Sequence, residues 1–204
     1  MKELKNFLSE KESLKKIADF SKDNKIPVIS NDVGRLLETI IFLKQPENIL
    51  EIGCGEGYST YYIIKNLGKG SYTGIDLNKK RLKKAERFIS SSFPEKEVLF
   101  INGNALKIIP ELEGCFDFVF IDAAKFEYPD YFELLQNKLS KDACIIADNV
   151  FFSEKIFSNY IKEHDKNSVT GLKEFVKHVS NSSLLKTIFL DIGDGVSVSV
   201  FRGK

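Results

Sequence analysis

The sequence predicts an α/β fold: a mostly parallel sheet, covered by helices on both faces, that ends in an antiparallel pair of strands. Short β-rich runs alternate with amphipathic helical segments from residue 48 onward, and such alternation requires crossover connections between parallel strands. A glycine-rich turn follows the first of these runs. Near the C-terminus, Gly193-Asp194-Gly195 joins two β-rich runs, and Asp-Gly in that position is a strong hairpin signal.

The N-terminal part is expected to be helical. Phe7–Phe20 carries apolar side chains at roughly helical spacing, and Pro27 ends the segment. Ser30-Asn31-Asp32 then offers capping residues for a helix over Val33–Leu43. The whole chain, residues 1–204, is interpreted as one domain with residues 1–45 as an N-terminal helical cap segment, since one core typically takes roughly 100–200 residues.

The alternating part begins at residue 48. Strands are expected, in order, over Asn48–Gly53, Tyr72–Asp76, Glu97–Gly103, Phe116–Asp122 and Ala143–Asn149. Helices are expected between and after them, over Tyr58–Leu67, Lys79–Ser90, Ala105–Leu112 and Tyr128–Leu139, with a further helix over Val169–Val179. The two hairpin strands are Lys186–Ile192 and Val196–Phe201.

Composition excludes some classes of function. The formal net charge of +1 gives no general attraction to nucleic acid or membrane. The N-terminus is charged and lacks the apolar core of a signal peptide, and no apolar stretch reaches the ~20 residues of a membrane span. The three cysteines are isolated from one another, which argues against a disulfide or zinc framework. We therefore expect a cytoplasmic protein.

The segment Glu51–Gly57 has the residues of a cofactor loop. Its three alternate glycines let the backbone approach a ligand closely, and Asp76 follows ~20 residues later, where an acid can accept bonds from ribose hydroxyls. The third glycine comes one residue too early for a dinucleotide motif, and Glu51 would suit a cofactor amino group. These details favour S-adenosylmethionine, with a dinucleotide or an unliganded turn as the alternatives.

Acidic and amide side chains end two later strands. Asp122 closes one, and Asp148-Asn149 closes the next. Two carboxylates and an amide oxygen suit Mg²⁺ or another divalent cation, whereas either feature alone is more typical of a helix cap or a turn. Lys125 lies three residues after Asp122 and is a candidate general base if its pKa is lowered, with a solvated lysine as the equal alternative.

Seven segments together are similar to one enzyme family. They are IPVIS (26–30), LEIGCGEGYS (50–59), GIDLN (74–78), GNAL (103–106), FDFVFIDAAKFEYPDYF (116–132), ADNVFF (147–152) and IGDGVSVS (192–199). With them the chain, from about Asn24 to Arg202, resembles the cation-dependent O-methyltransferases, which include catechol and caffeoyl-CoA O-methyltransferases and bacterial relatives. The resemblance implies a Rossmann-like class I methyltransferase fold, whose seven-stranded sheet has a reversed last strand, and a homodimer.

The resemblance also implies residue roles. Cofactor contacts would come from Ile29, Glu51, Gly53, Cys54, Ser59, Asp76, Ala105 and Asp122. Within this set, Asp76 would hold the ribose, Ala105 would border the adenine, and Glu51 would lie at the methionine end. The metal ligands would be Asp122, Asp148 and Asn149, and the catalytic base would be Lys125. The chain departs from the family in two places: Ala124 replaces a second acid found in many members, and the N-terminal region is short by roughly a helix.

The methyl acceptor is expected to be a catechol-like small molecule. The alternative is tRNA, because some bacterial relatives methylate 5-hydroxyuridine, and the basic stretch Lys79–Lys84 with Arg87 could contact phosphates unless it is simply a solvated helix face. Bases could stack on Phe126, Tyr128, Phe151 or Phe152, if these are not core or dimer contacts. A non-catalytic cofactor-binding module is a minor alternative.

Overall fold

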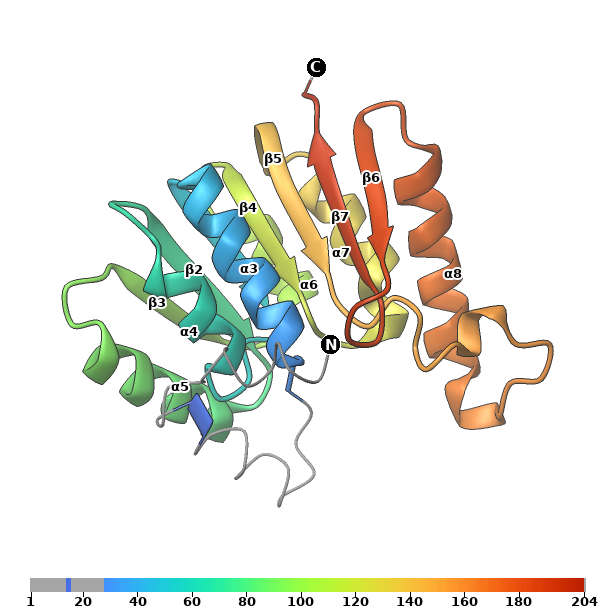
Figure 1. The fold of residues 1–204 in the computed structure, drawn as a ribbon, viewed down its shortest axis with the longest axis horizontal. Helices are drawn as coiled ribbons and strands as arrows, with labels where there is room; N and C mark the ends of the chain where they lie inside the picture. Colours follow the sequence, from blue (N-terminus) through green and yellow to red (C-terminus); the bar gives the residue numbers. More distant parts are fainter. Residues whose placement is uncertain (1–13, 16–27, 204) are drawn as a thin grey trace, which may run out of the picture.

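The structure is a computed structural model that describes residues 14–15 and 28–203. Its centre is a seven-stranded sheet in the order β3-β2-β1-β4-β5-β7-β6 (Figure 1). The strands are β1 (Asn48–Ile52), β2 (Ser71–Asp76), β3 (Val98–Asn102), β4 (Phe116–Ile121), β5 (Leu139–Ala147), β6 (Leu185–Leu190) and β7 (Val196–Phe201). The first five are mutually parallel, while β7 runs antiparallel to both β5 and β6.

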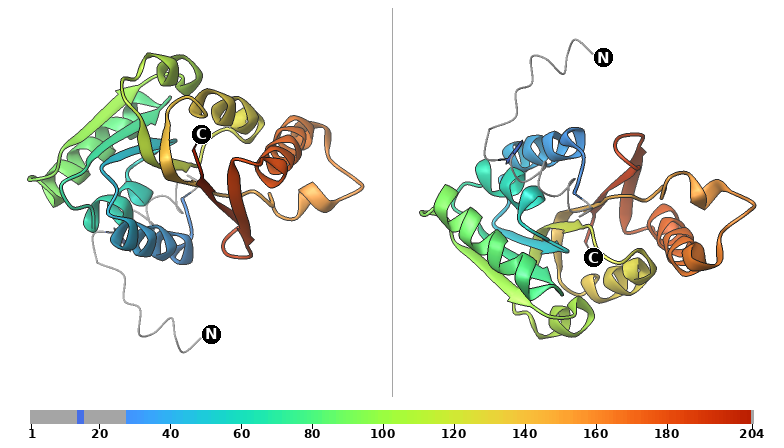
Figure 2. Two further views of the ribbon diagram at one scale, coloured as in Figure 1. Left: turned by 90° about the horizontal axis from the view of Figure 1, so that it is seen from above. Right: turned by 90° about the horizontal axis from the view of Figure 1, so that it is seen from below.

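Helices cover both faces of this sheet. The α-helices are α3 (Asn31–Lys44), α4 (Tyr58–Lys65), α5 (Lys79–Ser92), α6 (Ala105–Ile108), α7 (Tyr128–Leu135) and α8 (Lys166–Asn181). Short 3-10 turns are η1 (Ile109–Glu111), η2 (Lys125–Glu127), η3 (Lys155–Phe157) and η4 (Glu163–Asp165). In both views of Figure 2, α3 and α4 lie on the opposite side of the sheet from α7 and α8.

The strand sequences explain why the core has two halves. Successive side chains of a strand point to opposite faces, and the central strands are apolar at almost every position, as strands buried on both faces must be. Leu50 and Val119 pack into the half formed with α7 and α8, whereas Ile49, Phe118 and Phe120 pack into the half formed with α3 and α4.

The strand order indicates which edge of the sheet is suited to ligand binding. The order reverses between β1, which continues towards β2, and β4, which continues towards β5. In open α/β sheets, ligands bind beyond the carboxyl ends of the strands at such a switch point. Several helices start at this edge on side-chain caps: Asn78 accepts from the Lys80 and Arg81 amides for α5, and Asn104 accepts from the Leu106 amide for α6.

The C-terminal hairpin reaches the same edge. Its turn contains Gly193 and Gly195, both with positive φ, and it lies against the loop that follows β5. The Val150 amide donates to the Gly195 carbonyl at 2.9 Å, and the Phe151 amide donates to the Asp194 carbonyl at 3.0 Å. A Cβ added at Gly195 would lie 2.3 Å from the Phe151 ring, so this close packing requires glycine.

The predicted elements are largely confirmed, with one clear error at β5. The helix predicted over Tyr128–Leu139 ends at Leu135, and β5 begins at Leu139 rather than at Ala143. Leu139 pairs with Phe116, and Cys144 pairs with Phe118, so β5 advances by five residues while β4 advances by two and the register shifts. This bulge, with Asp142 at φ 59°, breaks the simple alternation that marks a strand.

Two other predicted helices are not seen as single described helices. The helix predicted over Phe7–Phe20 lies outside the described residues, except for Leu14 and Lys15. The short helix predicted over Ala105–Leu112 divides into α6 and the turn η1. Of the helices that the structure describes, none combines the length and the apolar character needed to cross a membrane.

Candidate active site

A cavity of about 780 Å³ lies beyond the carboxyl ends of the five parallel strands, β1 to β5. One end of it is formed by the glycine loop and the residues after β2 and β3, and the other end by the residues after β4 and β5. Its wall comprises Ile52, Gly53, Gly55, Ile75, Asp76, Leu77, Arg81, Gly103, Asn104, Ala105, Asp122, Ala123, Ala124, Lys125, Phe126, Glu127, Tyr131, Asn149, Phe152 and Asp194.

The glycine loop turns sharply because Gly53, Gly55 and Gly57 all have positive φ. Gly53 has a second constraint, since a Cβ there would lie 2.1 Å from the backbone oxygen of Asp122. The loop is also tied to the sheet, as the Gly53 amide donates to the Ile75 carbonyl at 2.8 Å. Main-chain contact between this loop and the end of β4 brings the two halves of the cavity together.

Asp76 lies at the end of β2, on the cavity wall, as the ribose assignment requires. Its Oδ2 accepts from the Gly55 amide at 2.8 Å, and its Oδ1 accepts from the Asn78 amide at 2.7 Å. Each carboxylate oxygen can accept more than one hydrogen bond, so the side chain is oriented by the backbone and still able to accept bonds from a ligand. Ala105 borders the same end of the cavity.

Glu51 is fully buried below the loop and is absent from the cavity wall. Ser59 donates to its Oε1, while Thr60 at 2.8 Å and Tyr72 at 2.5 Å donate to its Oε2. Burial outweighs these hydrogen bonds and raises the pKa of Glu51 to about 7. In this structure Glu51 joins β1 to α4 and β2, and a direct contact with a cofactor amine remains a prediction.

Three other predicted cofactor residues are similarly enclosed. Cys54, Ser59 and Ile29 are buried, and the cavity wall includes none of them. Ile29 packs with α3 in one half of the core, directly before Ser30, the residue that caps this helix. Their assignment to the cofactor also remains a prediction, whereas Gly53, Asp76, Ala105 and Asp122 are all brought to one cavity.

The acids after β4 and β5 lie next to each other. Ile121 pairs with Ala147, so Asp122 and Asp148 follow on neighbouring strands. Burial, and next the charge of Asp122, raise the pKa of Asp148 to about 7. Asp148 Oδ1 is fully enclosed and has no hydrogen-bond partner among the described residues. A buried carboxylate oxygen without a partner is costly unless a ligand satisfies it.

This arrangement fits a divalent cation. The described part of the chain contains no group of three or more His, Cys, Asp and Glu side chains that could hold a metal, so the donors would be the two carboxylates and the Asn149 amide oxygen. Such a set, completed by water and substrate oxygens, is what Mg²⁺ commonly takes. Asn149 lies on the cavity wall and has φ 55°, a conformation that asparagine tolerates better than most residues.

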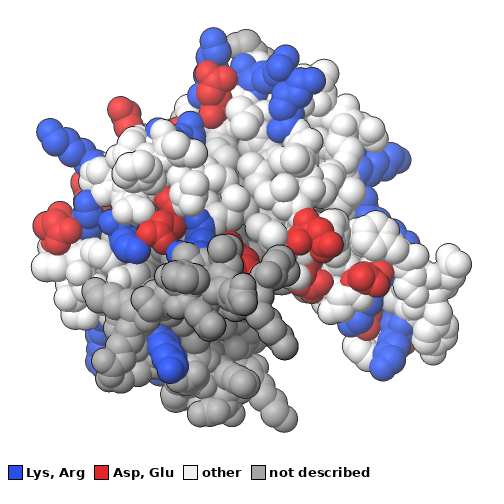
Figure 3. All heavy atoms as spheres, in the orientation of Figure 1, with Lys and Arg blue, Asp and Glu red and all other residues white. Residues whose placement is uncertain are grey.

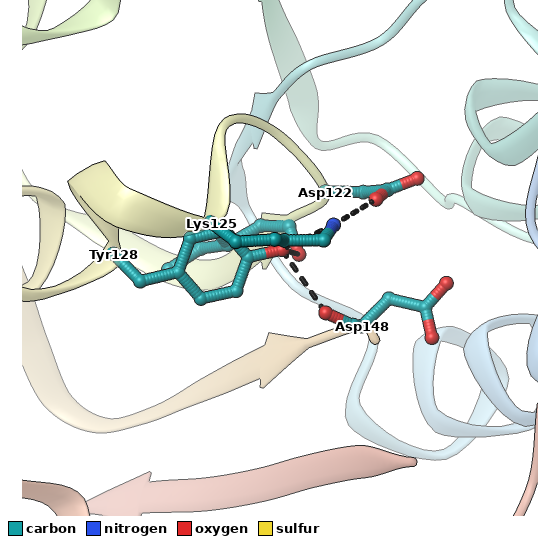
Figure 4. A network of polar contacts seen from close by, with 5 residues as sticks. Asp122, Lys125, Tyr128 and Asp148 are labelled. Carbon is teal, nitrogen blue, oxygen red and sulfur yellow. Dashed lines mark hydrogen bonds and ion pairs between the residues drawn. The ribbon is translucent and has the colours of Figure 1, made fainter. Parts of the chain in front are cut away.

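Lys125 lies between Asp122 and a buried tyrosine. Its Nζ donates to Asp122 Oδ1 at 2.9 Å and to the Tyr128 hydroxyl at 3.0 Å (Figure 4). Burial disfavours the charged form, but Tyr128 and Asp122 outweigh it, so the pKa of Lys125 lies above its usual value. The ligand-free site therefore holds Lys125 as a cation, which is the opposite of the state required of a base.

A second cavity, of about 600 Å³, adjoins the first through Asp194, which lines both. Its wall comprises Phe151, Ser153, Glu154, Phe157, Asp191, Gly193, Asp194 and Gly195. Acidic side chains gather beside the turn between β6 and β7 in Figure 3, and none of the described residues on this wall is a lysine or an arginine. The loop above it is strained, since Phe152, Ser153 and Glu154 all have positive φ.

Several residues of these walls were not predicted from the sequence. Asn104 and Arg81 were not assigned to the cofactor end, and Asp194 and Tyr131 were not assigned to the other end. Asn104 could have been found, since it precedes a short helix after the third strand. Tyr131 gave no signal, because an aromatic residue at helical spacing reads as core.

The buried acids predict a dependence of stability on pH. The folded, ligand-free protein holds protons at Glu51 and Asp148 up to about pH 7, whereas their ordinary values are 4.5 and 3.8. The folded state therefore binds more protons, and its free energy of unfolding should fall as the pH rises from about 4 to 7. Denaturant titrations at several pH values check this, with a smaller slope expected for Glu51→Gln. An equal slope in that variant would show that Glu51 is ionised throughout.

Comparison with known proteins agrees with this geometry. The sequence model of the O-methyltransferase family matches residues 5–201. A catechol O-methyltransferase from Niastella koreensis is 29% identical over 184 residues, which cover 85% of this chain and 82% of the relative. A caffeoyl-CoA O-methyltransferase from Populus kitakamiensis is 28% identical over 176 residues, covering 82% and 75% respectively.

Solved structures show the same fold. The O-methyltransferase TomG from Streptomyces achromogenes, in complex with S-adenosylmethionine, has a TM-score of 0.84 at 26% identity and covers 96% of this chain and 92% of its own. An O-methyltransferase from Bacillus cereus, in complex with S-adenosylhomocysteine, has a TM-score of 0.85 at 24% identity, with 96% and 93% covered. Fold, cavity and family match together lead to one conclusion: the chain belongs to the O-methyltransferase family.

Proposed function

We propose that this O-methyltransferase transfers a methyl group from S-adenosylmethionine to a hydroxyl of a catechol-like molecule with the help of a divalent cation. The observation that carries the proposal is the enclosed Asp148 carboxylate oxygen without a described partner, beside Asp122. Asp122 and Asn149 lie on the wall of the same cavity as the glycine loop. A methyl donor and a chelated acceptor could therefore be held face to face.

The donor end of the cavity supports S-adenosylmethionine. The glycine loop and Asp76 lie at the switch point of the sheet, which suits a nucleoside with a ribose. Two proteins of the same fold, described above, are complexes with this cofactor or its demethylated product. The space beside Ala105, on the far side of Asp76 from the glycine loop, would take the adenine.

At the acceptor end, Asp122, Asp148 and Asn149 would hold the cation. When bound, such a cation supplies positive charge that lowers the pKa of an acceptor hydroxyl. Its presence would also satisfy the Asp148 oxygen and balance the charge of Asp122. Lys125 would then lose part of the interaction that raises its pKa, and it could accept a proton.

The transfer itself would be a direct displacement. The acceptor oxygen attacks the methyl carbon of the sulfonium, the carbon–sulfur bond breaks, and S-adenosylhomocysteine leaves as a neutral thioether. The hydroxyl proton goes to Lys125 Nζ or to solvent. Most of the acceleration would come from alignment of oxygen, carbon and sulfur, which is worth up to about 7–11 kcal/mol in well-oriented systems.

Charge at the acceptor end favours a small molecule over tRNA. Glu127 and Asp194 line that end, and the adjoining cavity adds Glu154 and Asp191, so a polyanion would meet mainly negative charge. The basic stretch predicted as a phosphate contact lies on α5, after β2, with Arg81 at the donor end. Of the aromatic residues considered for base stacking, Tyr128 is fully buried, whereas Phe126 and Phe152 line the cavity.

The acceptor class can be tested with methyl-labelled cofactor and two substrate pools, a set of catechols and hypomodified tRNA. We expect label in the catechol pool and none in the tRNA pool above a control without protein. Label confined to tRNA would replace the catechol proposal with the tRNA alternative. Cofactor binding with no label in either pool would favour the non-catalytic module.

A further inference from the structure

The hydroxyl of Tyr128 is a buried junction between the ends of β4 and β5 and Lys125. It lies 3.0 Å from Lys125 Nζ, 3.0 Å from the carbonyl oxygen of Asp148 and 3.3 Å from the carbonyl oxygen of Ile121 (Figure 4). The Tyr128 side chain is fully buried, and burial, its largest influence, keeps the pKa of the phenol above its usual value. The group is therefore a neutral phenol with one proton to donate.

That single proton sets the direction of the network. Lysine can only donate, so the phenol oxygen accepts from Lys125 Nζ and directs its own proton to a carbonyl. Ile121 O already accepts from the Asp148 amide at 3.0 Å, which is the last hydrogen bond between the two strands. Asp148 O is the closer of the two carbonyls and lies just beyond that bond, so it is the better acceptor for the phenol.

Packing fixes the position of the phenol ring. Phe175 of α8 meets the Tyr128 ring edge-on, with centroids 5.5 Å apart at 83°. The turn η2, which carries Lys125, is pressed against the same helix, since a Cβ on Gly171 would lie 2.7 Å from Phe126 Cα and 2.9 Å from the Lys125 carbonyl oxygen. Both partners of the hydrogen bond are thus held by α8, and little freedom remains in their separation.

We propose that Tyr128 is a positioning residue: Asp148 O orients its proton, and its oxygen then holds Lys125 Nζ beside Asp122 at the acceptor end. This inference rests on the proposed O-methyl transfer, in which Lys125 lies beside the acceptor oxygen. Tyr128 itself is not on the cavity wall and touches neither donor nor acceptor, so it acts through Lys125. The hydrogen bond fixes where the amine lies, and misplacement of a reacting group by about 1 Å can cost about 10²-fold in rate.

The variant Tyr128→Phe removes only the hydroxyl and keeps the ring against Phe175. We expect kcat with a catechol to fall by roughly 10- to 100-fold, with the KM for S-adenosylmethionine unchanged within about twofold. In a Lys125→Ala background, the same substitution should change kcat by no more than about twofold, because groups that act as one unit are not additive. Independent, multiplicative effects of the two substitutions would overturn the proposal.

A second readout needs no catalysis. Competitive amine labelling of the metal-free protein, quantified by mass spectrometry, reports how firmly each lysine is held. Tyr128→Phe should increase the labelling of Lys125 by severalfold and leave Lys44 unchanged, a half-buried lysine whose Nζ donates to the Asp142 carbonyl at 3.0 Å near the opposite edge of the sheet. Unchanged labelling of Lys125 would show that Tyr128 does not hold it.

The matched control is Thr187→Val on β6. Thr187 Oγ1 also donates to a backbone carbonyl, that of Val179 at 2.9 Å, but Thr187 is on neither cavity wall. Both variants lose one hydroxyl donor and should melt at a lower temperature than the wild type, and only Tyr128→Phe should lose kcat. Equal loss of kcat in both would reduce Tyr128 to a structural role. A wild-type protein that methylates no catechol would overturn the proposed function instead, while the labelling result would still decide whether Tyr128 holds Lys125.

Discussion

Replacement of Asp148 by alanine is expected to lower the rate of methyl transfer by about 10²- to 10³-fold, the loss typical when a group that stabilises the transition state is removed. The affinity for S-adenosylmethionine should stay within about threefold of the wild type, because Asp148 is not on the donor wall. Single-turnover rates and calorimetric titration with the cofactor measure the two effects separately. A large loss of cofactor affinity would mean that the acceptor end has been misassigned.

The thermal stability of Asp148→Ala is a second readout of the same substitution. Asp148 is buried with one carboxylate oxygen unsatisfied and a pKa of about 7, so at pH 8 the ligand-free fold holds a desolvated charge. Asp148→Ala should therefore not lower the melting temperature at pH 8, and a rise is expected. Asp117→Ala is the matched control. That carboxylate accepts from the Glu47 and Asn48 amides at the opposite edge of the sheet, so the variant should lose stability but keep activity.

Gly53→Ala is expected to have the second largest effect, through loss of the donor site. Gly53 has φ 92°, and a Cβ there would lie 2.1 Å from the Asp122 carbonyl oxygen. The loop cannot yield without separating β1 from β4, where the Asp122 amide donates to the Ile52 carbonyl at 2.9 Å. We expect either no folded protein or a loss of cofactor affinity of at least about 10²-fold, as overpacking against backbone forces main-chain shifts.

The control variant Gly114→Ala separates two causes of the loss, backbone strain at positive φ and the steric clash of the added Cβ. Gly114 also has positive φ, at 77°, but a Cβ there would meet nothing within 4 Å. This variant should lose only about 1–3 kcal/mol of stability from backbone strain and keep its cofactor affinity. Thermal unfolding and cofactor titration of both variants provide the comparison. If Gly53→Ala were as mild as Gly114→Ala, the close approach between the glycine loop and Asp122 would not exist in the protein.

Much of the fold could be predicted because the local signals agree with the tertiary structure. The apolar runs, the capping residues Asn78 and Asn104, and the Asp194-Gly195 pair each mark an element where it forms. The start of β5 could not be predicted in this way. Leu139 pairs with Phe116 on one side of the bulge, and Cys144 pairs with Phe118 on the other side. Only contact with β4 determines this change of register.

The site was predictable to the extent that it depends on strand ends. Residues that follow parallel strands meet at one edge, so Asp76, Asp122 and Asn149 lie on one cavity as expected. Which side chains face that cavity depends on packing, and here sequence reasoning was weaker. Nothing in the order of residues indicates that Glu51 lies below the loop with three hydroxyl donors, or that Tyr128 joins Lys125 to Asp148.

The proposed role of Asp122, Asp148 and Asn149 is tested most directly by metal dependence. The rate of methyl transfer to a catechol should be measured after treatment with EDTA, and again after Mg²⁺ is restored. We expect activity to be lost with EDTA and recovered with Mg²⁺ in the wild type, with no recovery in Asp148→Ala. Undiminished turnover in EDTA would contradict a metal at this site.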